Sequence, residues 1–534
     1  MNILTGKHDG FTRHALDAHL LMLTPEQTVQ EILDKRPWMV GISASAQDNI
    51  TATFEVVGLL RKNGYAGHIT IGGHFPTYEH DKILTHVPGI DSVVRGEGEI
   101  TVVELAEYVK DGNPLDDVKG ITFRNCFGEI VVNPDRPLVE DLDTLPLPHR
   151  DTIGILLEKN RRISMLASRG CYARCSFCSI QTFFNWRPRR VRKVEQVVGE
   201  MLQLYKKYGV RKFKFVDDLF IDPSKKSRDW ILSFCEKIKE AGMNDLNLWL
   251  QVRAVCVRED IFLALKEIGL KKIFLGLESG HADSLKRYQK DITPEQNVEA
   301  VRILKKVGIP EISIGMMPFE PEVSLEGIKE NIEFLKKLGT FDIRDVTGKF
   351  KPYSGTPLTE KLLAEGRIKR KNWYHLGDYD FTDPRVGQLY HMVMSYFRHA
   401  KPSLKHIYHM DYRMRKIEGR VMQPGLNSEE NEYKESYLAL RRDIERFIQD
   451  HGEMMLQLVE GTIEAIESGM TPSMEQEWMR KSEKEFHQAE QLTLPLFERI
   501  SVLESQLGLV KKEPHSLHVA EVKVLLNQNS QGWE

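Results

Sequence analysis

Three cysteines lie within eight residues of one another, in the segment Cys171-Tyr172-Ala173-Arg174-Cys175-Ser176-Phe177-Cys178. Thiolates at this C-x3-C-x2-C spacing can surround one compact inorganic cofactor. A structural zinc site needs four closed ligands, and no fourth cysteine or histidine lies nearby in the sequence. A 4Fe–4S cluster can be held by three cysteines, which leaves one iron open. The spacing therefore favours a cluster on Cys171, Cys175 and Cys178, with a zinc-stabilised binding module as the non-enzymatic alternative.

The other cysteines, Cys126, Cys235 and Cys256, are scattered, and we expect them to be small buried apolar residues. Six cysteines in 534 residues do not form a disulfide framework. The N-terminus lacks a signal-peptide core, and no apolar stretch could span a bilayer. We therefore expect a cytoplasmic protein with reduced thiols and no membrane partner.

The composition, with 41% hydrophobic and 28% charged residues, is typical of a soluble globular protein of two or three domains. A formal charge of −3 gives no electrostatic reason to expect a nucleic-acid partner. The basic run at 187–193 could bind phosphate, but a solvated approach to a helix is the simpler interpretation.

The elements that must position the cysteines alternate between strands and helices. Residues 1–133 predict a flavodoxin-like parallel sheet, closed by a pair of strands at 118–132. Its predicted strands are 38–43, 68–73 and 91–95, and its predicted helices are 49–63, 79–87 and 99–110. Prolines and acidic residues mark 134–160 as a linker.

Residues 161–357 resume the alternation and predict a partial (β/α)6 barrel. The candidate strands are 163–168, 212–217, 246–252, 271–277, 310–315 and 341–347. The cysteine segment follows the first of these, at the mouth where barrels place their chemistry. Residues 358–534 predict a helical C-terminal cap, with a long amphipathic stretch at 427–467. Its aromatic and histidine residues at 373–409 could line a substrate pocket, but interfacial packing is the simpler interpretation.

The cysteine spacing, the aromatic residue before the last cysteine and the place after a first barrel strand resemble the radical S-adenosylmethionine (SAM) superfamily. The resemblance covers about residues 160–357. It extends to Asp217-Asp218, Arg253, Gly276-Leu277-Glu278-Ser279-Gly280, Leu285-Lys286-Arg287-Tyr288-Gln289-Lys290 with Thr293-Pro294-Glu295, and Lys351-Pro352-Tyr353-Ser354-Gly355-Thr356-Pro357. It implies that SAM binds the open iron and is cleaved reductively to a 5′-deoxyadenosyl radical.

The same resemblance implies roles for four residues at the predicted strand ends and in the cysteine segment. Phe177 is expected near the adenine, and Arg253 beside the SAM carboxylate. Glu278 and Asp217 are candidates for contacts to the amino group or ribose. As alternatives, Arg253 and Glu278 could form a salt bridge across the barrel mouth, and Asp217 or Asp218 could cap the helix starting near Pro223.

The N-terminal sheet resembles the cobalamin-binding domain that precedes many radical SAM barrels, chiefly through the loop Arg95-Gly96-Glu97-Gly98-Glu99. Ligands of parallel sheets bind where the strands end, so we expect cobalamin contacts from one residue set: Ser43, Gly72, Gly73, Gly96 and Glu97. The opening strand of that domain is expected to be missing, because residues 3–19 resemble a later part of it. The Asp-x-His-x-x-Gly signature is absent, so no histidine is expected below the cobalt, although His74 is a tempting ligand.

The sequence thus predicts a cobalamin-dependent radical SAM enzyme that modifies an unactivated carbon of a small molecule, by methyl transfer. The alternative with the same fold is oxidative cyclisation or rearrangement. The expected cofactors are a 4Fe–4S cluster, SAM and cobalamin. An electron donor such as flavodoxin or ferredoxin is the expected protein partner. The sequence identifies no catalytic residue beyond the cofactor ligands, and it does not name the substrate.

Overall fold

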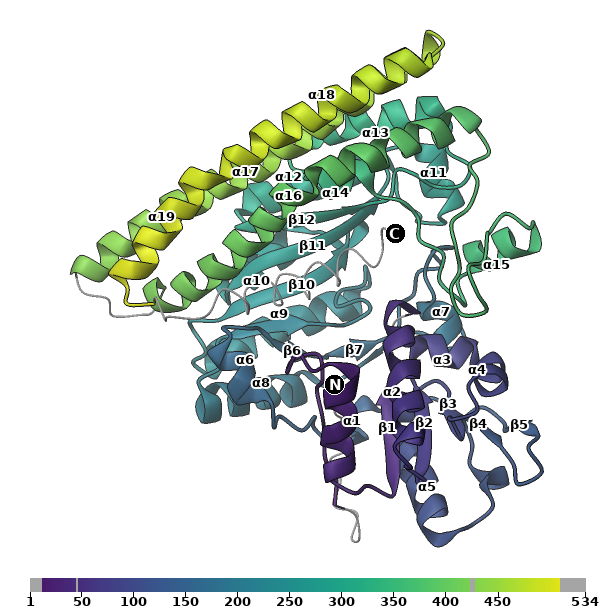
Figure 1. Cartoon of the computed structure of the whole chain (residues 1–534). Helices are drawn as coiled ribbons and strands as arrows, with labels where there is room; N and C mark the ends of the chain where they lie inside the picture. The colour runs from purple at the N-terminus through teal and green to yellow at the C-terminus, as the bar shows by residue number, and fades with distance from the viewer. Residues whose placement is uncertain (1–11, 45–46, 423–427, 510–534) are drawn as a thin grey trace.

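The computed structural model describes residues 12–44, 47–422 and 428–509. The expectation for the opening of the chain falls largely on residues 1–11, which lie outside this part. An N-terminal α/β unit lies beside a larger curved sheet with its helices, and long C-terminal helices lie along the opposite side of that sheet (Figure 1). The predicted domain limits at 133, 160 and 357 stay predictions.

The N-terminal unit is a five-stranded sheet in the order β1-β2-β3-β4-β5. The first three strands are parallel, and the last two form the predicted antiparallel closing pair. Its strands are β1 (Met39–Ser43), β2 (His68–Gly72), β3 (Ser92–Val94), β4 (Ile121–Arg124) and β5 (Ile130–Val132). Its helices are α1 (Pro25–Asp34), α2 (Ile50–Lys62), α3 (His74–Tyr78), α4 (His80–His86) and α5 (Gly98–Asp111). Because β1, β2 and β3 run the same way, their carboxyl ends share one edge.

The second sheet is fully parallel, in the order β12-β11-β10-β9-β6. Its strands are β6 (Ile163–Met165), β9 (Lys212–Phe215), β10 (Asn247–Arg253), β11 (Leu270–Glu278) and β12 (Glu311–Met316). A small antiparallel pair, β7 (Ser168–Arg169) with β8 (Arg190–Val191), follows β6. The associated helices are α6 (Ile153–Glu158), α7 (Ile180–Phe183), α8 (Val194–Tyr208), α9 (Lys225–Glu240), α10 (Glu259–Glu267), α11 (Ala282–Arg287), α12 (Pro294–Val307) and α13 (Leu325–Leu338).

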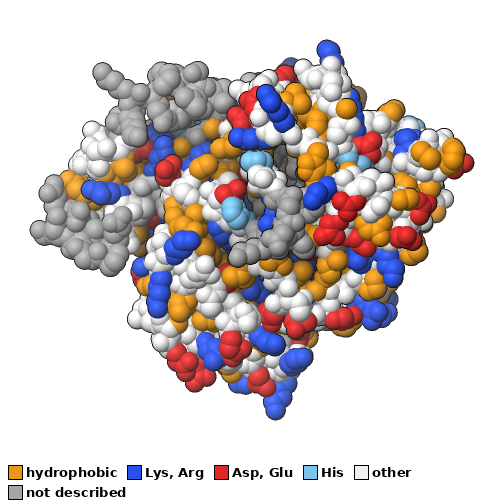
Figure 2. Space-filling view, turned by 90° about the horizontal axis from the view of Figure 1, so that it is seen from below, with side chains coloured by type: hydrophobic (Ala, Val, Ile, Leu, Met, Phe, Trp, Pro, Cys, Tyr) orange, Lys and Arg blue, Asp and Glu red, His pale blue; other side chains and the backbone are white. Residues whose placement is uncertain are grey.

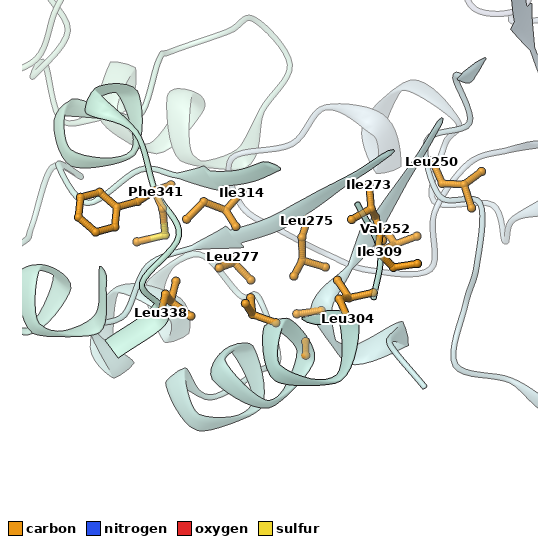
Figure 3. Packing of buried hydrophobic residues seen from close by; sticks show 14 of the residues in the cluster. Leu250, Val252, Ile273, Leu275, Leu277, Leu304, Ile309, Ile314, Leu338 and Phe341 are labelled. Carbon is orange, nitrogen blue, oxygen red and sulfur yellow. The ribbon is translucent and has the colours of Figure 1, made fainter. Parts of the chain in front are cut away.

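Strand alternation gives this sheet two different faces. On the outer face, residues such as Leu250, Leu275 and Leu277 are buried in one apolar cluster together with helix residues such as Leu304 (Figure 3). The intervening positions face inward and stay partly exposed along the strands. The sheet is therefore the wall of a partial barrel, with a packed apolar outer face and a more polar, partly exposed inner face.

The sixth predicted strand, at 341–347, is wrong. The segment forms a short helix, α14 (Ile343–Thr347), because Asp342 caps it and exchanges capping bonds with Asp345. This local capping prevails over the β-branched residues that suggested a strand. The sixth position of the barrel is instead marked by a single parallel bridge between Phe319 and Lys349.

The C-terminal region is mainly helical in the described residues, as predicted, apart from an irregular segment at 366–383 that carries an antiparallel bridge between Ile368 and Tyr379. Its helices are α15 (Pro357–Ala364), α16 (Pro384–Val421), α17 (Ser428–Glu467), α18 (Pro472–Gln491) and α19 (Thr493–Gln506). Apolar residues of α16 and α17, such as Met410 and Leu458, belong to the same buried cluster as the barrel strands. Across the described ranges, no helix combines the length and apolar character required to cross a bilayer.

A buried ionic group joins the N-terminal unit to the barrel. The Glu97 carboxylate, at the start of α5, lies 2.8 Å from Arg169 Nη1 and 2.9 Å from Arg190 Nη1. It also accepts a hydrogen bond from the Val139 backbone N–H, and Arg169 bonds Glu99 as well. The Glu97 side chain is only 6% exposed. Arg169 lies two residues before Cys171, so this group fixes the cysteine loop against the first sheet.

Replacing Glu97 by Ala should lower the free energy of unfolding by about 3 kcal/mol, because two buried guanidinium groups lose their shared partner. Denaturant titration measures the change. The control is Asp380→Ala, which removes the exposed partner of Lys369 and should leave the free energy of unfolding nearly unchanged. Equal, small effects of both substitutions would show that the buried group does not join the two units.

Candidate active site

The three cysteines lie on the loop between β7 and α7, at the carboxyl edge of the barrel sheet. Their thiols are free; Cys175 is buried, while Cys171 and Cys178 are partly exposed. Burial raises the pKa of Cys178 to about 12 and raises that of Cys171. A positive centre bound there would therefore be needed to hold them as thiolates.

The cysteine loop is anchored to the segment that follows α11. The Ser176 backbone N–H donates to the Tyr288 carbonyl at 2.9 Å, and the Ser176 hydroxyl donates to the Arg287 carbonyl at 2.9 Å. The phenyl ring of Phe177 meets Tyr288 edge-on, with 5.1 Å between centroids. These contacts set the orientation of the loop between its second and third cysteines.

Arg253 ends β10 and points at the cysteine loop. Its Nη1 donates to Cys175 Sγ at 2.8 Å, and its Nη2 donates to the Lys290 carbonyl. Its Nε is buried and, among the described residues, has no acceptor. The alternative salt bridge between Arg253 and Glu278 is wrong, because neither side chain bonds the other. Arg253 thus brings a cation to the centre of the predicted cluster site.

Glu278 pairs instead with Lys290, whose Nζ lies 2.7 Å from Glu278 Oε1 and whose side chain is 4% exposed. The pair lies over Gly276, where an added Cβ would come within 2.7 Å of the same oxygen. The backbone around the pair is strained, with positive φ at Glu278, Gln289 and Asp291. Such strain in non-glycine residues is characteristic of functional sites.

Lys290 is a candidate that the sequence argument missed. Its Nζ lies 5.7 Å from the centre of the Phe177 ring, so it lies between the predicted adenine and amino-acid contacts of SAM. One lysine in a lysine-rich segment carries no distinguishing signal. Only the bend imposed by the strained residues on either side brings it to the mouth.

Asp217 is fully enclosed and supports the start of the cysteine loop. Its carboxylate accepts hydrogen bonds from the Ala167 backbone N–H at 3.1 Å and from the Ser168 hydroxyl at 2.6 Å. Burial raises its pKa to about 6. The alternative that it caps the following helix is wrong, because Ser224 caps α9. Its contact with SAM stays a prediction. The carboxylate is already occupied by these two protein groups.

The predicted cobalamin residues gather at the carboxyl edge of the first sheet. The register pairs Ser43 with Gly72 across β1 and β2, and β3 leads directly into Gly96. Gly73 has φ 122° and Gly96 has φ 68°, conformations that favour glycine. Four of the five residues thus share one edge, and three of the four are glycines. Glu97 lies beside them, but its carboxylate is taken up by Arg169 and Arg190.

This edge packs directly on the cysteine-bearing part of the barrel. The Tyr78 hydroxyl at the end of α3 donates to the Ser179 carbonyl at 2.8 Å and lies 2.9 Å from the Thr182 hydroxyl. The His74 ring stacks on Phe183 with 3.9 Å between centroids, and burial lowers its pKa. Ser179 follows Cys178, so the two predicted cofactor sites are neighbours.

The basic run is mostly committed to internal bonds. Arg189 pairs with Asp222 at 2.8 Å, Arg192 pairs with Glu200 at 2.8 Å, and Arg190 belongs to the Glu97 group. The solvated interpretation is therefore wrong for these three arginines. Among the scattered cysteines, Cys235 and Cys256 are buried as expected, whereas Cys126 is exposed in the turn between β4 and β5.

The aromatic stretch after α15 contacts the N-terminal unit and the other helices. Trp373 stacks on Phe54 of α2 and His86 of α4, at 5.5 and 4.8 Å. In the helical bundle, His399 bonds Ser482 and His406 bonds Thr493. These contacts favour the interfacial interpretation over a substrate pocket.

The donor set fits an iron–sulfur cluster. Three disulfide-free thiols on one loop are soft ligands of the kind that clusters use. In the part of the chain that the structure describes, no three His, Cys, Asp or Glu side chains converge as ligands of a single metal ion. A cluster distributes its ligands over separate iron atoms, so it does not require such convergence.

Comparison with known proteins gives two family matches. Residues 165–335 match the Radical SAM superfamily, and residues 6–106 match the B12 binding domain. An uncharacterized methyltransferase of Pyrococcus horikoshii is 29% identical over 383 residues, which cover 70% of this chain and 81% of that protein. The anaerobic magnesium-protoporphyrin IX monomethyl ester cyclase of Cereibacter sphaeroides is 26% identical, covering 75% and 66%.

A solved structure shares the fold. The cobalamin-dependent S-adenosylmethionine radical enzyme OxsB, with aqua-cobalamin and SAM bound, matches 96% of this chain and 78% of its own at a TM-score of 0.68 and 19% identity. Fold and matched segments together define a B12-binding α/β domain ahead of a radical SAM barrel. The chain belongs to the cobalamin-dependent radical SAM enzymes, whose cofactors are a 4Fe–4S cluster, SAM and cobalamin.

Enzymes of this family require a reductant and a small-molecule substrate. The chain spans only 50% to 66% of the length of several curated relatives. The activities of those proteins bear on this chain only as proposals.

Proposed function

We propose that this chain binds a 4Fe–4S cluster through Cys171, Cys175 and Cys178 and transfers a methyl group to an unactivated carbon of a small molecule. The observation that carries the proposal is the position of the cysteine loop. It lies at the barrel mouth, within bonding distance of Arg253, and the edge of the B12-type sheet packs beside it. When bound and reduced, these cofactors supply a 5′-deoxyadenosyl radical from SAM and a transferable methyl group from cobalamin.

The residues at the mouth bind and orient SAM in this proposal. Arg253 and Lys290 present two cations to the SAM carboxylate, and Glu278 accepts from its amino group. Without SAM, Glu278 and Lys290 neutralise each other, so the pair opens when a ligand brings both charges. Phe177 packs on the adenine, and Asp217 keeps the first strand and the cysteine loop in register.

At the facing edge, Gly73 and Gly96 leave room for the flat face of cobalamin, and Ser43 and Gly72 contact it from the ends of the neighbouring strands. The Glu97 group fixes the distance between this edge and the barrel. His74 is held in a ring stack, so it is not the cobalt ligand in this proposal. The electron reaches the cluster from a small carrier protein such as a flavodoxin or ferredoxin. A low-potential cluster and free thiols suit the cytoplasm.

Oxidative cyclisation is the second candidate, because relatives include anaerobic magnesium-protoporphyrin IX monomethyl ester cyclases. The match to the named methyltransferase covers 81% of that protein, against 53% to 66% of the cyclases, which favours methyl transfer. The mass of the product separates the two reactions, since methylation adds one carbon and cyclisation does not.

Anaerobic reconstitution should yield about four iron and four sulfide per chain. Replacing Cys171, Cys175 or Cys178 by Ala should abolish this content, because each removes one of three ligands. Cys235→Ala is the matched control, since it changes a buried thiol on α9 far along the chain. Iron and sulfide analysis and the cluster absorbance provide the measurement. A normal cluster in Cys175→Ala, or stoichiometric zinc in the wild-type chain, would contradict the assignment.

Lys290→Met and Arg253→Ala should each weaken SAM binding about tenfold or more, because each removes a charge-assisted hydrogen bond. Equilibrium dialysis with reconstituted protein measures binding, and cluster absorbance shows whether the site is intact. Lys286→Met, on the preceding helix α11, is the control and should bind SAM as the wild type does. Unchanged binding in Lys290→Met would restrict Lys290 to a structural role.

Protein supplied with hydroxocobalamin should retain it after desalting, and reduced protein should transfer the methyl group of SAM to it. Gly73→Val should block retention, because a branched side chain would occupy the space of the ligand. Gly64→Val is the control: Gly64 also has positive φ, at 79°, but it precedes β2 at the opposite end of that strand. Equal loss in both variants would attribute the effect to backbone strain. The reduced, paramagnetic cobalamin spectrum should show no histidine nitrogen.

A further inference from the structure

The inner face of the barrel carries a layer of charged and aromatic residues below the mouth. The parallel register places Ser164, Lys214, Trp249, Lys272 and Glu311 side by side across the five strands. All five positions are partly exposed, whereas their neighbours on the outer face are mostly buried in the core. This layer therefore lies on the inner face of the barrel.

Positive charge exceeds negative charge in this layer. Lys214 Nζ lies 3.9 Å from the Trp249 ring centre, with Lys272 Nζ at 5.3 Å and Arg162 Cζ at 5.7 Å. Glu311 is the carboxylate of the layer; it pairs with Lys272 at 3.2 Å and lies 3.8 Å from Arg441 of α17. Within the described chain, Lys214 has neither a carboxylate partner nor a hydrogen-bond acceptor. Burial, Arg162 and Lys272 together lower its pKa.

The unsatisfied groups around Trp249 are all donors. Trp249 Nε1 and Arg162 Nε are buried and lack an acceptor among the described residues, while Arg162 Nη2 donates to Asn247. Buried donors are normally paired, and leaving one unpaired costs free energy. Two unpaired donors and an unpaired lysine thus lie beside one another. An anion is the kind of partner that would satisfy all three.

Partly exposed residues continue along the inner face from this layer towards the mouth. Two residues further along the strands lie Val216, Gln251, Phe274 and Ser313, all partly exposed. Another two residues on, Arg253 stands beside the paired Gly276 and Gly315. Four residues of strand span about 13 Å. A ligand of roughly that length could therefore touch both levels.

We propose that the barrel interior binds a small-molecule substrate with an anionic group, phosphoryl or carboxylate, held by Lys214, Arg162 and Trp249. Its opposite end lies at the mouth, beside Arg253, about 13 Å away. The assignment rests on the proposed function, since it defines the substrate class of the same barrel. Gln251 and Ser313 offer polar contacts along the way, and Phe274 and Val216 offer apolar ones.

The test is calorimetric titration of the reconstituted full chain with inorganic pyrophosphate and, separately, with glutarate. At least one should bind at millimolar concentration or tighter. Lys214→Met should weaken binding about tenfold or more, because a charge-assisted contact is lost. Lys214→Arg should keep it within about threefold. Lys271→Met, the neighbouring exposed lysine of β11 on the outer face, is the matched control and should bind normally.

Preference for pyrophosphate assigns a phosphoryl group, and preference for glutarate assigns a carboxylate. The inference is overturned if neither binds the wild type below about 10 mM, or if Lys271→Met weakens binding as much as Lys214→Met. Trp249→Phe, which keeps an aromatic side chain and removes the N–H donor, should weaken binding several-fold and guards against misfolding of the lysine variants. Formation of 5′-deoxyadenosine with dithionite is measured in parallel. If it persists while anion binding fails, only this inference falls; if it fails in the wild type while anions bind, the proposed chemistry falls instead.

Discussion

The arrangement of the whole molecule depends on one carboxylate enclosed by two guanidinium groups. Glu97 comes from the edge of the first sheet, Arg169 from the approach to the cysteine loop and Arg190 from the strand that pairs with it. A buried charge is tolerated only where its partners are fixed, so this group allows little variation in the distance between the two sheets. Reactions that use two large cofactors together need such a fixed separation.

The barrel mouth illustrates how strain and charge are combined at one place. The Glu278–Lys290 pair is nearly excluded from solvent, lies over a glycine and is bordered by residues with positive φ. The same segment receives the hydrogen bonds of Ser176 and Arg253. The cysteine loop, its neighbouring cation and the ion pair therefore form one connected unit, and a ligand that separates the pair acts on the loop as well.

Much of the fold and the position of the cysteine loop could be predicted from the sequence, because the patterns that indicate them are local. The cysteine spacing, the alternation of strands and helices and the glycines at strand ends depend on short segments, and the structure places them as expected. The errors arose where local and distant contacts compete. Residues 341–347 have a strand-like composition, but the Asp342 cap makes them helical. Partners of Arg253, Glu278 and Glu97 come from distant segments, and no sequence pattern reveals that Lys290 bends into the mouth.

The apolar cores are distributed so that the N-terminal sheet and the rest of the protein differ in how they unfold. The barrel and the C-terminal helices share one continuous buried cluster, whereas the N-terminal sheet has separate ones. Shared apolar burial couples segments into a cooperative unit, and ionic contacts hold units together with a strength that falls as salt rises. The C-terminal helices are thus as integral to the barrel as its own strands. The cobalamin-type sheet has apolar cores of its own and meets the barrel largely through polar contacts such as the Glu97 group, so rising salt should loosen this junction before it loosens either core.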